Sequence, residues 1–383
     1  MKRLLSSCLA SSLLSVSVIS TALAQPAATT PAPAARPAPV ISPEVNPDHS
    51  VIFRIKAPKA TEVSVRGQWA KEALPMVKGN DGVWSGSAGI VPAGVWEYSI
   101  VVDGVNMIDP GNPALKPMRE PRSSILHIAG SPAQVWDFQD VPHGTVHQHS
   151  YLSKVLNRSR ELWVYTPPGY ESKTSGKLPL LVLQHGSGDN QQTWVAHGKA
   201  NWILDNLVAA GKARPMVVVM LDGHPLGRSV SQDPVKRAEA TEAFRRELFE
   251  DALPLVEHSY RVKKDASDRA IVGLSMGGGQ SLNVGLGNLD RFSWVGSFSG
   301  VAPADIVSNK LQADVRGTNA KLRLLWIGCG KDDSLKARNE EFVTKLKAAG
   351  IEHQWHLTEG GHTWPVWRGY LADFLPLLFQ SKK

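Results

Sequence analysis

The feature that most constrains the fold is a series of short, almost uninterrupted apolar runs from Leu162 onward. These runs cover residues 178–184, 216–221, 270–274, 294–298 and 322–327. Segments with helical periodicity separate them, at about 197–210, 235–257, 277–286 and 335–349, and a last one covers 366–379. Strands that are apolar throughout are typical of a parallel sheet covered by helices on both faces. We therefore predict an α/β fold with a doubly wound sheet, whose ligands bind at the carboxyl ends of the strands.

The preceding part of the chain has a different hydrophobic pattern. Short alternating runs between residues 51 and 128 are separated by Gly-, Pro- and Asp-rich turns, a pattern typical of a small all-β sandwich. We assign residues 45–130 to an immunoglobulin-like module, 131–150 to a linker and 151–383 to the α/β domain. Trp69, Trp84 and Trp96 fall in the module. They are candidates for stacking on sugars, but alternating aromatics favour core positions.

The N-terminus has the features of a secretory signal peptide. Lys2 and Arg3 precede a mainly apolar stretch, and Ala-Leu-Ala at 22–24 is a small-x-small cleavage site. We predict cleavage after Ala24, a Pro/Ala-rich linker over 25–44, and a secreted or periplasmic protein. No later segment reaches the roughly 20 apolar residues that cross a bilayer, so no membrane insertion is expected. Removal of the signal leaves Cys329, which we expect to be buried in a strand.

The charge pattern argues against several classes of partner. The formal net charge is +7 without a run of basic residues, so no nucleic-acid partner is expected. His143, His147 and His149 lie close in the sequence, but their spacing alone does not make a metal site. We predict no metal and no cofactor. The sequence does not define the oligomeric state.

The sharpest local motif is Gly-Leu-Ser-Met-Gly at 273–277. It follows an apolar strand and opens a helical segment, which is the context that a nucleophile elbow requires. Glycines are needed there because the turn is strained and the backbone is crowded. We therefore predict that Ser275 is a catalytic nucleophile.

A serine nucleophile needs a base, and the base needs an acid that orients it. The motif predicts that residues 151–383 form an α/β-hydrolase domain, and in that fold the chain order is Ser, acid, His. Gly-Cys-Gly-Lys-Asp-Asp at 328–333 follows an apolar strand, so Asp333 is the preferred acid and Asp332 the alternative. His362, in Gly-Gly-His at 360–362, follows another strand and is the predicted base.

The negative oxygen of a tetrahedral intermediate needs backbone donors. We predict the N–H of Met276, directly after the nucleophile, and the N–H of Ser187, with Gly186 as the alternative. Nearby candidates for substrate contacts are His185, Trp194 and Trp364.

These motifs resemble carbohydrate esterase family 1, the esterase D-like group with feruloyl and acetylxylan esterases. The matching stretches lie at 164–170, 184–188, 218–224, 273–280, 330–333 and 361–364. The resemblance implies an acyl-enzyme mechanism on an ester-substituted polysaccharide or oligosaccharide and supports the assignment of Ser275, Asp333 and His362. Gln184 departs from it, since an apolar residue usually stands there. The N-terminal module resembles early-set modules of carbohydrate-binding module family 48.

Several functions share these residues. Release of ferulate from plant cell-wall arabinoxylan is the preferred hypothesis. Hydrolysis of acetylated xylan, cleavage of an enterobactin-type siderophore and acyl transfer are the enzymatic alternatives. A glycan-binding protein with a degenerate esterase domain is the alternative outside enzymes. Fold alone does not separate these functions.

Overall fold

The computed structural model describes residues 39–172, 176–227 and 233–380. The predicted signal peptide and most of the predicted linker lie outside these ranges. The sandwich and the α/β domain belong to one compact unit that begins at Val40.

The N-terminal module is an all-β sandwich, as predicted. One sheet has the order β1-β2-β6-β5, and the other has the order β4-β3-β7-β8 with β9 paired to β7. The bounds of the first sheet are Glu44–Val45 (β1), Ser50–Lys56 (β2), Val83–Ile90 (β6) and Val77–Lys78 (β5). Those of the second are Leu74–Pro75 (β4), Val63–Gly67 (β3), Gly94–Val102 (β7), Val105–Met107 (β8) and Ser124–Ile128 (β9). The alternating pattern identified the longer strands but not the short β1, β4, β5 and β8.

The three tryptophans of the module belong to or contact its core. Trp84 is buried, and Trp69 and Trp96 pack against the same cluster while remaining partly exposed. The Trp69 ring stacks on Phe53, with 5.8 Å between the ring centroids and 6° between the planes. The core interpretation is therefore confirmed for Trp84, and one face of Trp69 is occupied by the core.

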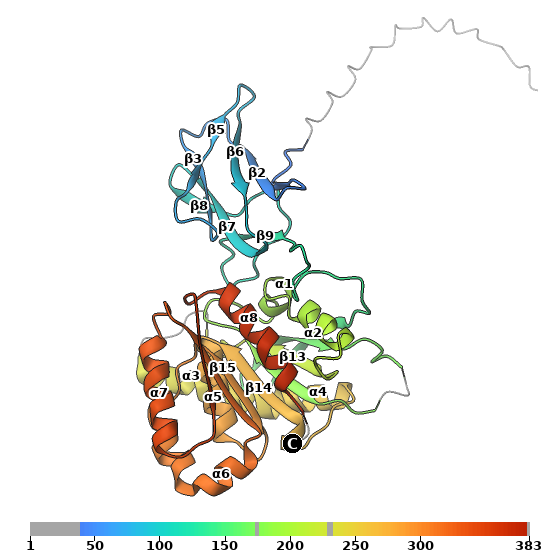
Figure 1. The fold of residues 1–383 in the computed structure, drawn as a ribbon, viewed down its shortest axis with the longest axis vertical. Helices are drawn as coiled ribbons and strands as arrows, with labels where there is room; N and C mark the ends of the chain where they lie inside the picture. The colour runs from blue at the N-terminus through green and yellow to red at the C-terminus, as the bar shows by residue number, and fades with distance from the viewer. Residues whose placement is uncertain (1–38, 173–175, 228–232, 381–383) are drawn as a thin grey trace, which may run out of the picture. The chain divides into compact units, whose positions relative to one another are not determined.

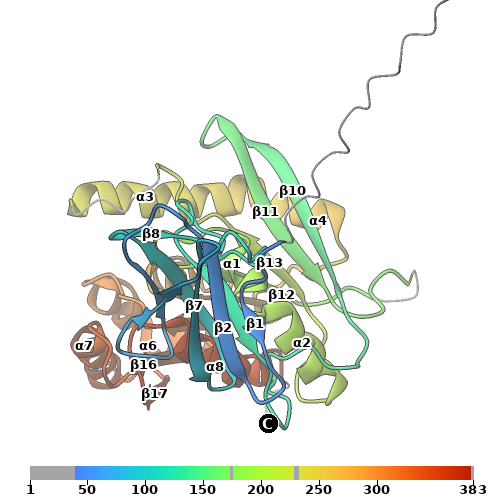
Figure 2. The same cartoon turned by 90° about the horizontal axis from the view of Figure 1, so that it is seen from above.

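The second part of the chain contains a mixed eight-stranded sheet in the order β10-β11-β13-β12-β14-β15-β16-β17. The strands that join antiparallel at one edge are β10 (Thr145–Ser153), β11 (Arg158–Thr166) and β13 (Val217–Leu221). The parallel strands continue with β12 (Leu180–Gln184), β14 (Arg269–Leu274), β15 (Trp294–Phe298), β16 (Leu324–Gly330) and β17 (Gln354–Thr358). Figure 2 shows β10 and β11 as a long hairpin at the sheet edge. This hairpin begins at Thr145, inside the range assigned to the linker. β10 is polar along most of its length and only its last residue is buried, so it lacks the apolar run that located the other strands.

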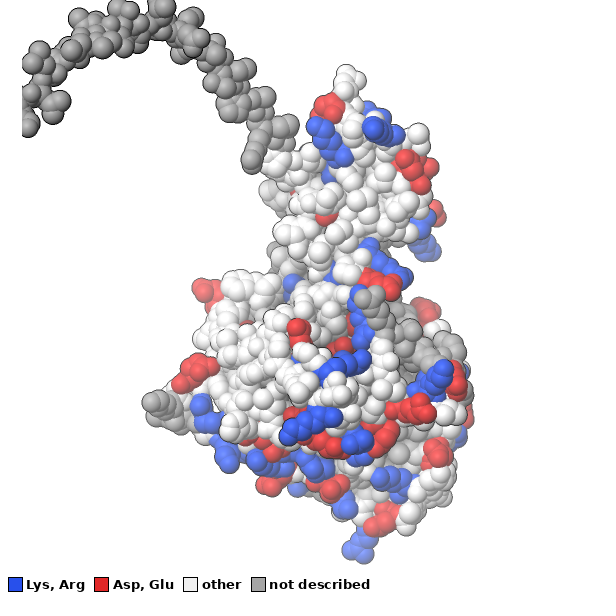
Figure 3. Space-filling view, turned by 180° about the vertical axis from the view of Figure 1, so that it is seen from behind, with Lys and Arg blue, Asp and Glu red and all other residues white. Residues whose placement is uncertain are grey.

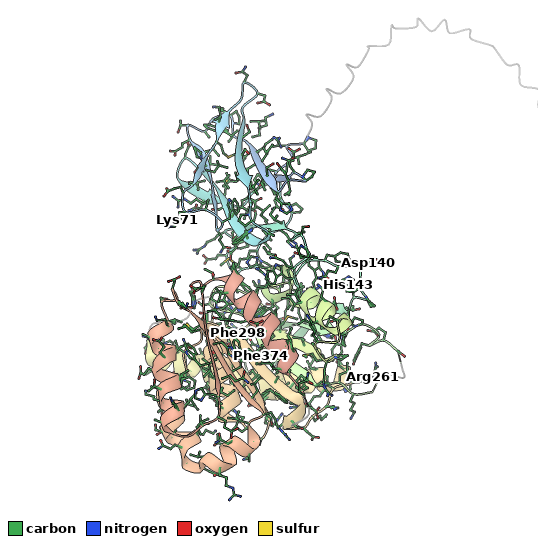
Figure 4. The ribbon with its side chains drawn as sticks, viewed as in Figure 1. Lys71, Asp140, His143, Arg261, Phe298 and Phe374 are labelled. Atoms are coloured by element: carbon green, nitrogen blue, oxygen red, sulfur yellow. The ribbon has the colours of Figure 1, made fainter. Side chains whose placement is uncertain are left out.

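Helices cover both faces of this sheet, so the predicted α/β-hydrolase fold is confirmed (Figure 1). One core cluster joins the sheet to α3 (Pro234–Glu247), α4 (Leu253–Ser259), α5 (Met276–Gly287) and α7 (Lys336–Ala348). The other joins it to α2 (Ala200–Ala209) and α8 (Trp364–Phe374). The short helices α1 (Thr193–Ala196) and α6 (Val315–Lys321) complete the set. On the α8 face, Phe298 of β15 and Phe374 meet edge to face, with ring centroids 5.9 Å apart (Figure 4).

The segment predicted as one helix over 235–257 contains a change of geometry. A π-helical turn over Leu248–Ala252 separates α3 from α4. Pro254 follows at the start of α4, and proline has no N–H to donate to the preceding turn. The wider turn accommodates this loss without ending the helix.

Within the described residues, no helix is long and apolar enough to cross a bilayer. On the face drawn in Figure 3, basic and acidic side chains are interspersed over the α/β domain and do not form a field of one sign.

Candidate active site

Ser275 lies on a sharp turn between β14 and α5. Its backbone has φ 50° and ψ −117°, a conformation that is strained for any residue with a side chain. The two motif glycines permit the turn, since a Cβ at Gly273 would lie 2.6 Å from the carbonyl carbon of Gly277. A Cβ at Gly277 would lie 2.4 Å from the carbonyl oxygen of His185. The turn leaves the serine side chain in a pocket at the carboxyl ends of the strands.

The structure brings Ser275, His362 and Asp333 together. His362 Nε2 lies 2.8 Å from Ser275 Oγ. On the other side of the ring, His362 Nδ1 lies 2.9 Å and 3.1 Å from the two carboxylate oxygens of Asp333. The neighbouring Asp332 is exposed and does not join this chain of hydrogen bonds. Of the two candidate acids, the structure therefore places Asp333 at the histidine.

The Asp333 carboxylate is buried and accepts several hydrogen bonds. Burial by itself raises the pKa of Asp333, but hydrogen bonds from His362, the Leu335 N–H and the Ser299 hydroxyl outweigh it and lower that pKa. The Leu335 N–H donates to Oδ1 over 2.8 Å. An ionised carboxylate next to Nδ1 fixes the ring orientation that leaves Nε2 free to accept the serine proton.

Ser299 and Trp367 extend this network, although sequence reasoning assigned no role to Ser299. Ser299 is fully buried directly after β15, with φ 54°. The Trp367 indole N–H donates to Ser299 Oγ over 3.1 Å. The same indole contacts the His362 ring edge to face, with 4.8 Å between centroids. The only signal for Ser299 was its position at the end of an apolar strand, which many serines share.

The loop after β12, which we predict to supply an oxyanion donor, lies beside Ser275. A Cβ at Gly186 would be 3.4 Å from the Cβ of Ser275, and Gly186 and Ser187 line the pocket. The Gly188 N–H donates to His224 Nε2 over 3.2 Å. By contrast, the N–H groups of Ser187 and Met276 donate to no other group in the described part of the chain. Both amides are therefore available to an oxygen on a bound substrate.

The three candidate substrate residues have different positions. Trp364 lines the pocket, although only 2% of its surface is exposed. Trp194 is buried in the core, where its indole N–H donates to the Gln184 carbonyl over 2.9 Å. His185 is also buried, and its Nε2 accepts the Gly223 N–H over 2.8 Å. Both side chains form hydrogen bonds with backbone groups behind the loop after β12. Neither Trp194 nor His185 lines the pocket.

His185, Asp222 and His224 are close enough for one metal ion to touch all three. Their polar atoms already have partners. Asp222 binds the guanidinium groups of Arg160 (2.9 Å) and Arg119 (3.1 Å). Burial lowers the pKa of His224, and the neutral ring uses Nε2 to accept the Gly188 N–H. This cluster braces the oxyanion loop, and two nearby cationic side chains oppose a bound cation.

The pocket beside Ser275 has a volume of about 360 Å³, within the range of pockets that hold small ligands. Trp364, Trp367, Leu274 and Met118 supply apolar surface, and other lining residues are polar. Gln68, Glu97, Lys116 and Met118 all come from the N-terminal part of the chain. Sequence reasoning missed these four because they lie far from the catalytic motifs in the chain.

Two ion pairs hold this N-terminal wall in place. Lys116 Nζ lies 3.0 Å from Glu97 Oε1 and 3.2 Å from Asp189 Oδ1, and all three side chains are largely buried. The backbone N–H of Arg119 also donates to the carbonyl of Gly188 over 3.0 Å. The segment after β8 therefore supports the oxyanion loop directly.

The fold and the geometry of Ser275, His362 and Asp333 define a protein of the serine α/β-hydrolase class. The model of the esterase family described as "Putative esterase" matches residues 153–378. The chain belongs to this family. The recognition of an esterase resembling carbohydrate esterase family 1 is thereby confirmed. The likeness of the N-terminal module to family 48 remains a prediction.

Individual relatives agree with this assignment. An endo-1,4-beta-xylanase/feruloyl esterase of Xylanibacter ruminicola is 30% identical over 348 residues, which cover 88% of this chain and 46% of that protein. The chain thus spans about half the length of that relative. The structure of a ferulic acid esterase has a TM-score of 0.53 at 30% identity, covering 61% of this chain and 97% of the other. An enterochelin esterase of Shigella flexneri shares the fold, with a TM-score of 0.62, 20% identity and coverage of 86% and 92%.

Proposed function

We propose that this chain is a serine carboxylic-ester hydrolase that releases ferulate or a similar hydroxycinnamate from plant cell-wall arabinoxylan. The observation that carries the proposal is the chain of hydrogen bonds from Asp333 through His362 to Ser275, at the mouth of a pocket with an aromatic wall. The similarity to proteins described as feruloyl and ferulic acid esterases supports the choice of acyl group.

The reaction proceeds through an acyl-enzyme. Ser275 Oγ attacks the ester carbonyl carbon while His362 Nε2 accepts its proton. The oxygen of the tetrahedral intermediate accepts hydrogen bonds from the N–H groups of Met276 and Ser187, each worth roughly 3 kcal/mol of the barrier. Collapse breaks the bond to the alcohol oxygen, and the proton on His362 goes to that alcohol. Water then attacks the acyl carbon in the same way, releases the carboxylic acid and regenerates Ser275.

The pocket suits a phenolic acyl group. Trp364 and Trp367 provide aromatic surface near Ser275, while Lys116, Glu97 and Asp189 provide polar atoms on another part of the wall. A pocket with apolar walls and a few convergent polar groups binds an aromatic ring and orients its hydroxyl. An acetyl group alone would leave most of this surface unused. The predicted signal peptide fits a substrate outside the cell, so we also propose that the protein is exported.

A substrate panel tests the proposal. We expect kcat/KM on methyl ferulate to exceed that on acetylated xylan and on a cyclic catecholate trilactone by at least about 10-fold, which corresponds to roughly 1.4 kcal/mol of transition-state binding. Preference for the trilactone would assign the siderophore function, and preference for acetylated xylan the acetyl function.

A fluorophosphonate probe separates an enzyme from a degenerate esterase domain. The probe should label the full chain, and Ser275→Ala should abolish both labelling and turnover. An unlabelled wild-type chain without turnover on any ester would contradict the proposed function. Transfer of the feruloyl group to an added alcohol in preference to water would instead indicate an acyltransferase.

A further inference from the structure

The end of β15 lies next to the nucleophile and next to the strand that leads to the acid. The Ser275 N–H donates to the carbonyl of Phe298, which Figure 4 labels, over 2.8 Å. The following residue, Ser299, donates its N–H to the carbonyl of Gly328 on β16 over 2.7 Å. β16 in turn leads into the loop that carries Asp333. The backbone at the end of β15 therefore connects the turn of the nucleophile with the loop of the acid.

The backbone of Ser299 is strained. Its φ of 54° lies in the left-handed region, which is unfavourable for a residue with a side chain. A glycine would adopt the same conformation without strain. The Ser299 side chain is also fully buried, where a hydroxyl needs hydrogen-bond partners. A buried polar side chain in a strained conformation beside an active site points to a function for its hydroxyl.

The hydrogen bonds of the Ser299 hydroxyl fix the direction of its proton. An indole N–H is a donor only, so Trp367 Nε1, which lies 3.1 Å from Ser299 Oγ, occupies an acceptor position of the hydroxyl. The hydroxyl proton must then point to another group, and the Asp333 carboxylate, which only accepts when ionised, is its partner. Two further donors, the Leu335 N–H and the His362 ring, hold the same carboxylate. None of the Asp333 side chain is exposed, so water does not replace a lost donor.

Trp367 connects this hydroxyl to the base and to the pocket. Its ring meets the His362 ring edge to face, with 4.8 Å between the centroids and 88° between the planes. The same side chain lines the pocket beside Ser275. One indole therefore acts on the acid through Ser299 and on the base by direct contact, so the two partners of the catalytic hydrogen bond share one support.

We propose that Ser299 is a positioning residue for the catalytic acid and that Trp367 sets the direction of its hydroxyl. The proposal rests on the proposed function, because it assigns a role in the same hydrolytic reaction. The Ser299 hydroxyl stabilises the ionised Asp333 carboxylate and restrains its rotation, so that both oxygens stay directed at His362. This restraint matters most when His362 carries the serine proton, because the imidazolium then depends on a correctly oriented carboxylate.

Two changes at position 299 of the full chain separate catalysis from folding. Ser299→Gly removes the hydroxyl and relieves the backbone strain, whereas Ser299→Ala removes the hydroxyl and retains the strain. We expect both to lower kcat on methyl ferulate by about 10-fold, which corresponds to roughly 1.4 kcal/mol, with KM within about twofold of the wild type. Ser299→Gly should not unfold at a lower temperature than Ser299→Ala. A loss of kcat shared by both variants then reports the missing hydroxyl and not the backbone.

Trp367→Phe removes the indole N–H and leaves an aromatic ring beside His362. We expect a smaller loss of kcat, about 3-fold, because the Ser299 hydroxyl remains but its direction is no longer fixed. Ser299→Ala/Trp367→Phe should lose no more than Ser299→Ala alone, since both changes act through one chain of hydrogen bonds. Trp294→Phe is the matched control. The Trp294 indole N–H donates to the Ser267 carbonyl over 2.8 Å, away from the pocket, so this variant should stay within about twofold of the wild-type kcat.

A pH profile supplies a readout that a purely structural role would not move. Among the described residues that interact with Asp333, Cys329 and Tyr370 are also ionisable, but burial raises the pKa of each to about 12, so both stay neutral in the assay range. Loss of the Ser299 donor raises the pKa of Asp333. The acid limb of the kcat/KM profile should therefore move to higher pH in both position-299 variants and stay in place in Trp294→Phe.

The rate of labelling by the fluorophosphonate probe gives the same comparison without an acyl group. Slower labelling of the position-299 variants, in a wild type that does not cleave methyl ferulate, would support the positioning role and reject the proposed acyl group. A wild type that is neither labelled nor active on any ester would overturn the proposed function and the positioning role together. Wild-type kcat in Ser299→Gly, or a loss in both variants with an unmoved acid limb, would overturn the positioning role alone.

Discussion

The environments of two neighbouring aspartates differ enough to give the two residues different roles. Asp332 and Asp333 are adjacent in the chain and chemically identical. Asp332 is exposed to solvent, whereas Asp333 is buried against His362 and bound by the Leu335 N–H. The sequence predicted a carboxylate at this strand end, with Asp333 preferred and Asp332 as the alternative. Which of the two aspartates reaches His362 depends on the conformation of the turn after β16, and the spacing of residues in the sequence does not determine that conformation.

Exchanging each of these aspartates for asparagine should separate their roles. Asp333→Asn keeps the shape but presents an amide to His362 Nδ1, which favours the wrong tautomer of the ring. We expect kcat to fall by roughly 10⁴-fold, as for removal of the same charge in other triads. Asp332→Asn is the control and should stay within about twofold of the wild type. A similar loss in both variants would assign the loop, not the Asp333 carboxylate, as the source of the effect. Steady-state kinetics on methyl ferulate measures both.

At the scale of elements, a buried ionic cluster joins β11, the end of β13 and α3. Arg160 on β11 forms two hydrogen bonds with Glu247, of 2.7 Å and 3.1 Å, and one of 2.9 Å with Asp222. Glu247 is fully buried and also accepts the Tyr151 hydroxyl over 2.7 Å. Such a cluster fixes which helix packs against the antiparallel edge of the sheet. Its geometry depends on the Arg160 guanidinium and the two carboxylates being present together.

Removing one partner of this cluster should be costly. Arg160→Met keeps much of the volume but leaves the buried Glu247 carboxylate without its cation, so we expect about 3–5 kcal/mol of lost stability. Arg246→Met is the control, because Arg246 forms an exposed i,i+4 pair with Glu250 on the surface of the same helical segment. That change should cost no more than about 0.5 kcal/mol. Chemical denaturation of both variants would show the difference, and equal small losses would contradict the structural role of the Arg160 cluster.

The sequence predicted local elements better than distant contacts. The buried strands of the α/β domain are almost entirely apolar, so β13, β14 and β15 were located within a residue or two. The nucleophile elbow was predictable because its strain demands glycines at fixed positions. The N-terminal wall of the pocket was not, because Glu97 of β7 and Lys116 reach the site through tertiary packing and ion pairs, which leave no periodic signal in the sequence. Trp194, a candidate substrate contact by sequence, lies in the core. A tryptophan near a catalytic loop has the same sequence signal whether it faces the substrate or the core.

For the molecule as a whole, buried ionisable groups form part of the contact between the sandwich and the α/β domain. Glu97 of β7 lies 3.5 Å from the imidazole of His197, which precedes α2. Arg368 of α8 donates to the carbonyls of His197 (2.9 Å) and of Val95 on β7 (3.4 Å). Burial, assisted by the charges of Arg368 and Lys116, lowers the pKa of His197 to about 3 despite the nearby Glu97 carboxylate. The contact is therefore built around a neutral imidazole and should be sensitive to acid.

The sign of this sensitivity follows from proton linkage. In the unfolded chain His197 gains a proton below its ordinary pKa of 6.5, whereas in the folded protein it stays neutral down to about 3. The unfolded state then binds more protons, so the free energy of unfolding falls as the pH drops below about 6.5. Glu97 adds to the loss below about 4.5, its ordinary pKa, and this contribution continues down to its folded value of about 2.

Replacing the imidazole by a ring that does not titrate should remove the earlier part of this acid response. We expect the wild-type Tm to fall by several degrees between pH 7 and pH 5, and His197→Phe to show a clearly shallower fall over the same interval. His258→Gln, at an exposed position on α4, should retain the wild-type slope. Thermal unfolding followed by circular dichroism at closely spaced pH values is the measurement. Parallel curves for the wild type and His197→Phe would show that the acid sensitivity arises at other groups, whereas a flattened curve for His197→Phe alone would assign it to the contact between the two domains.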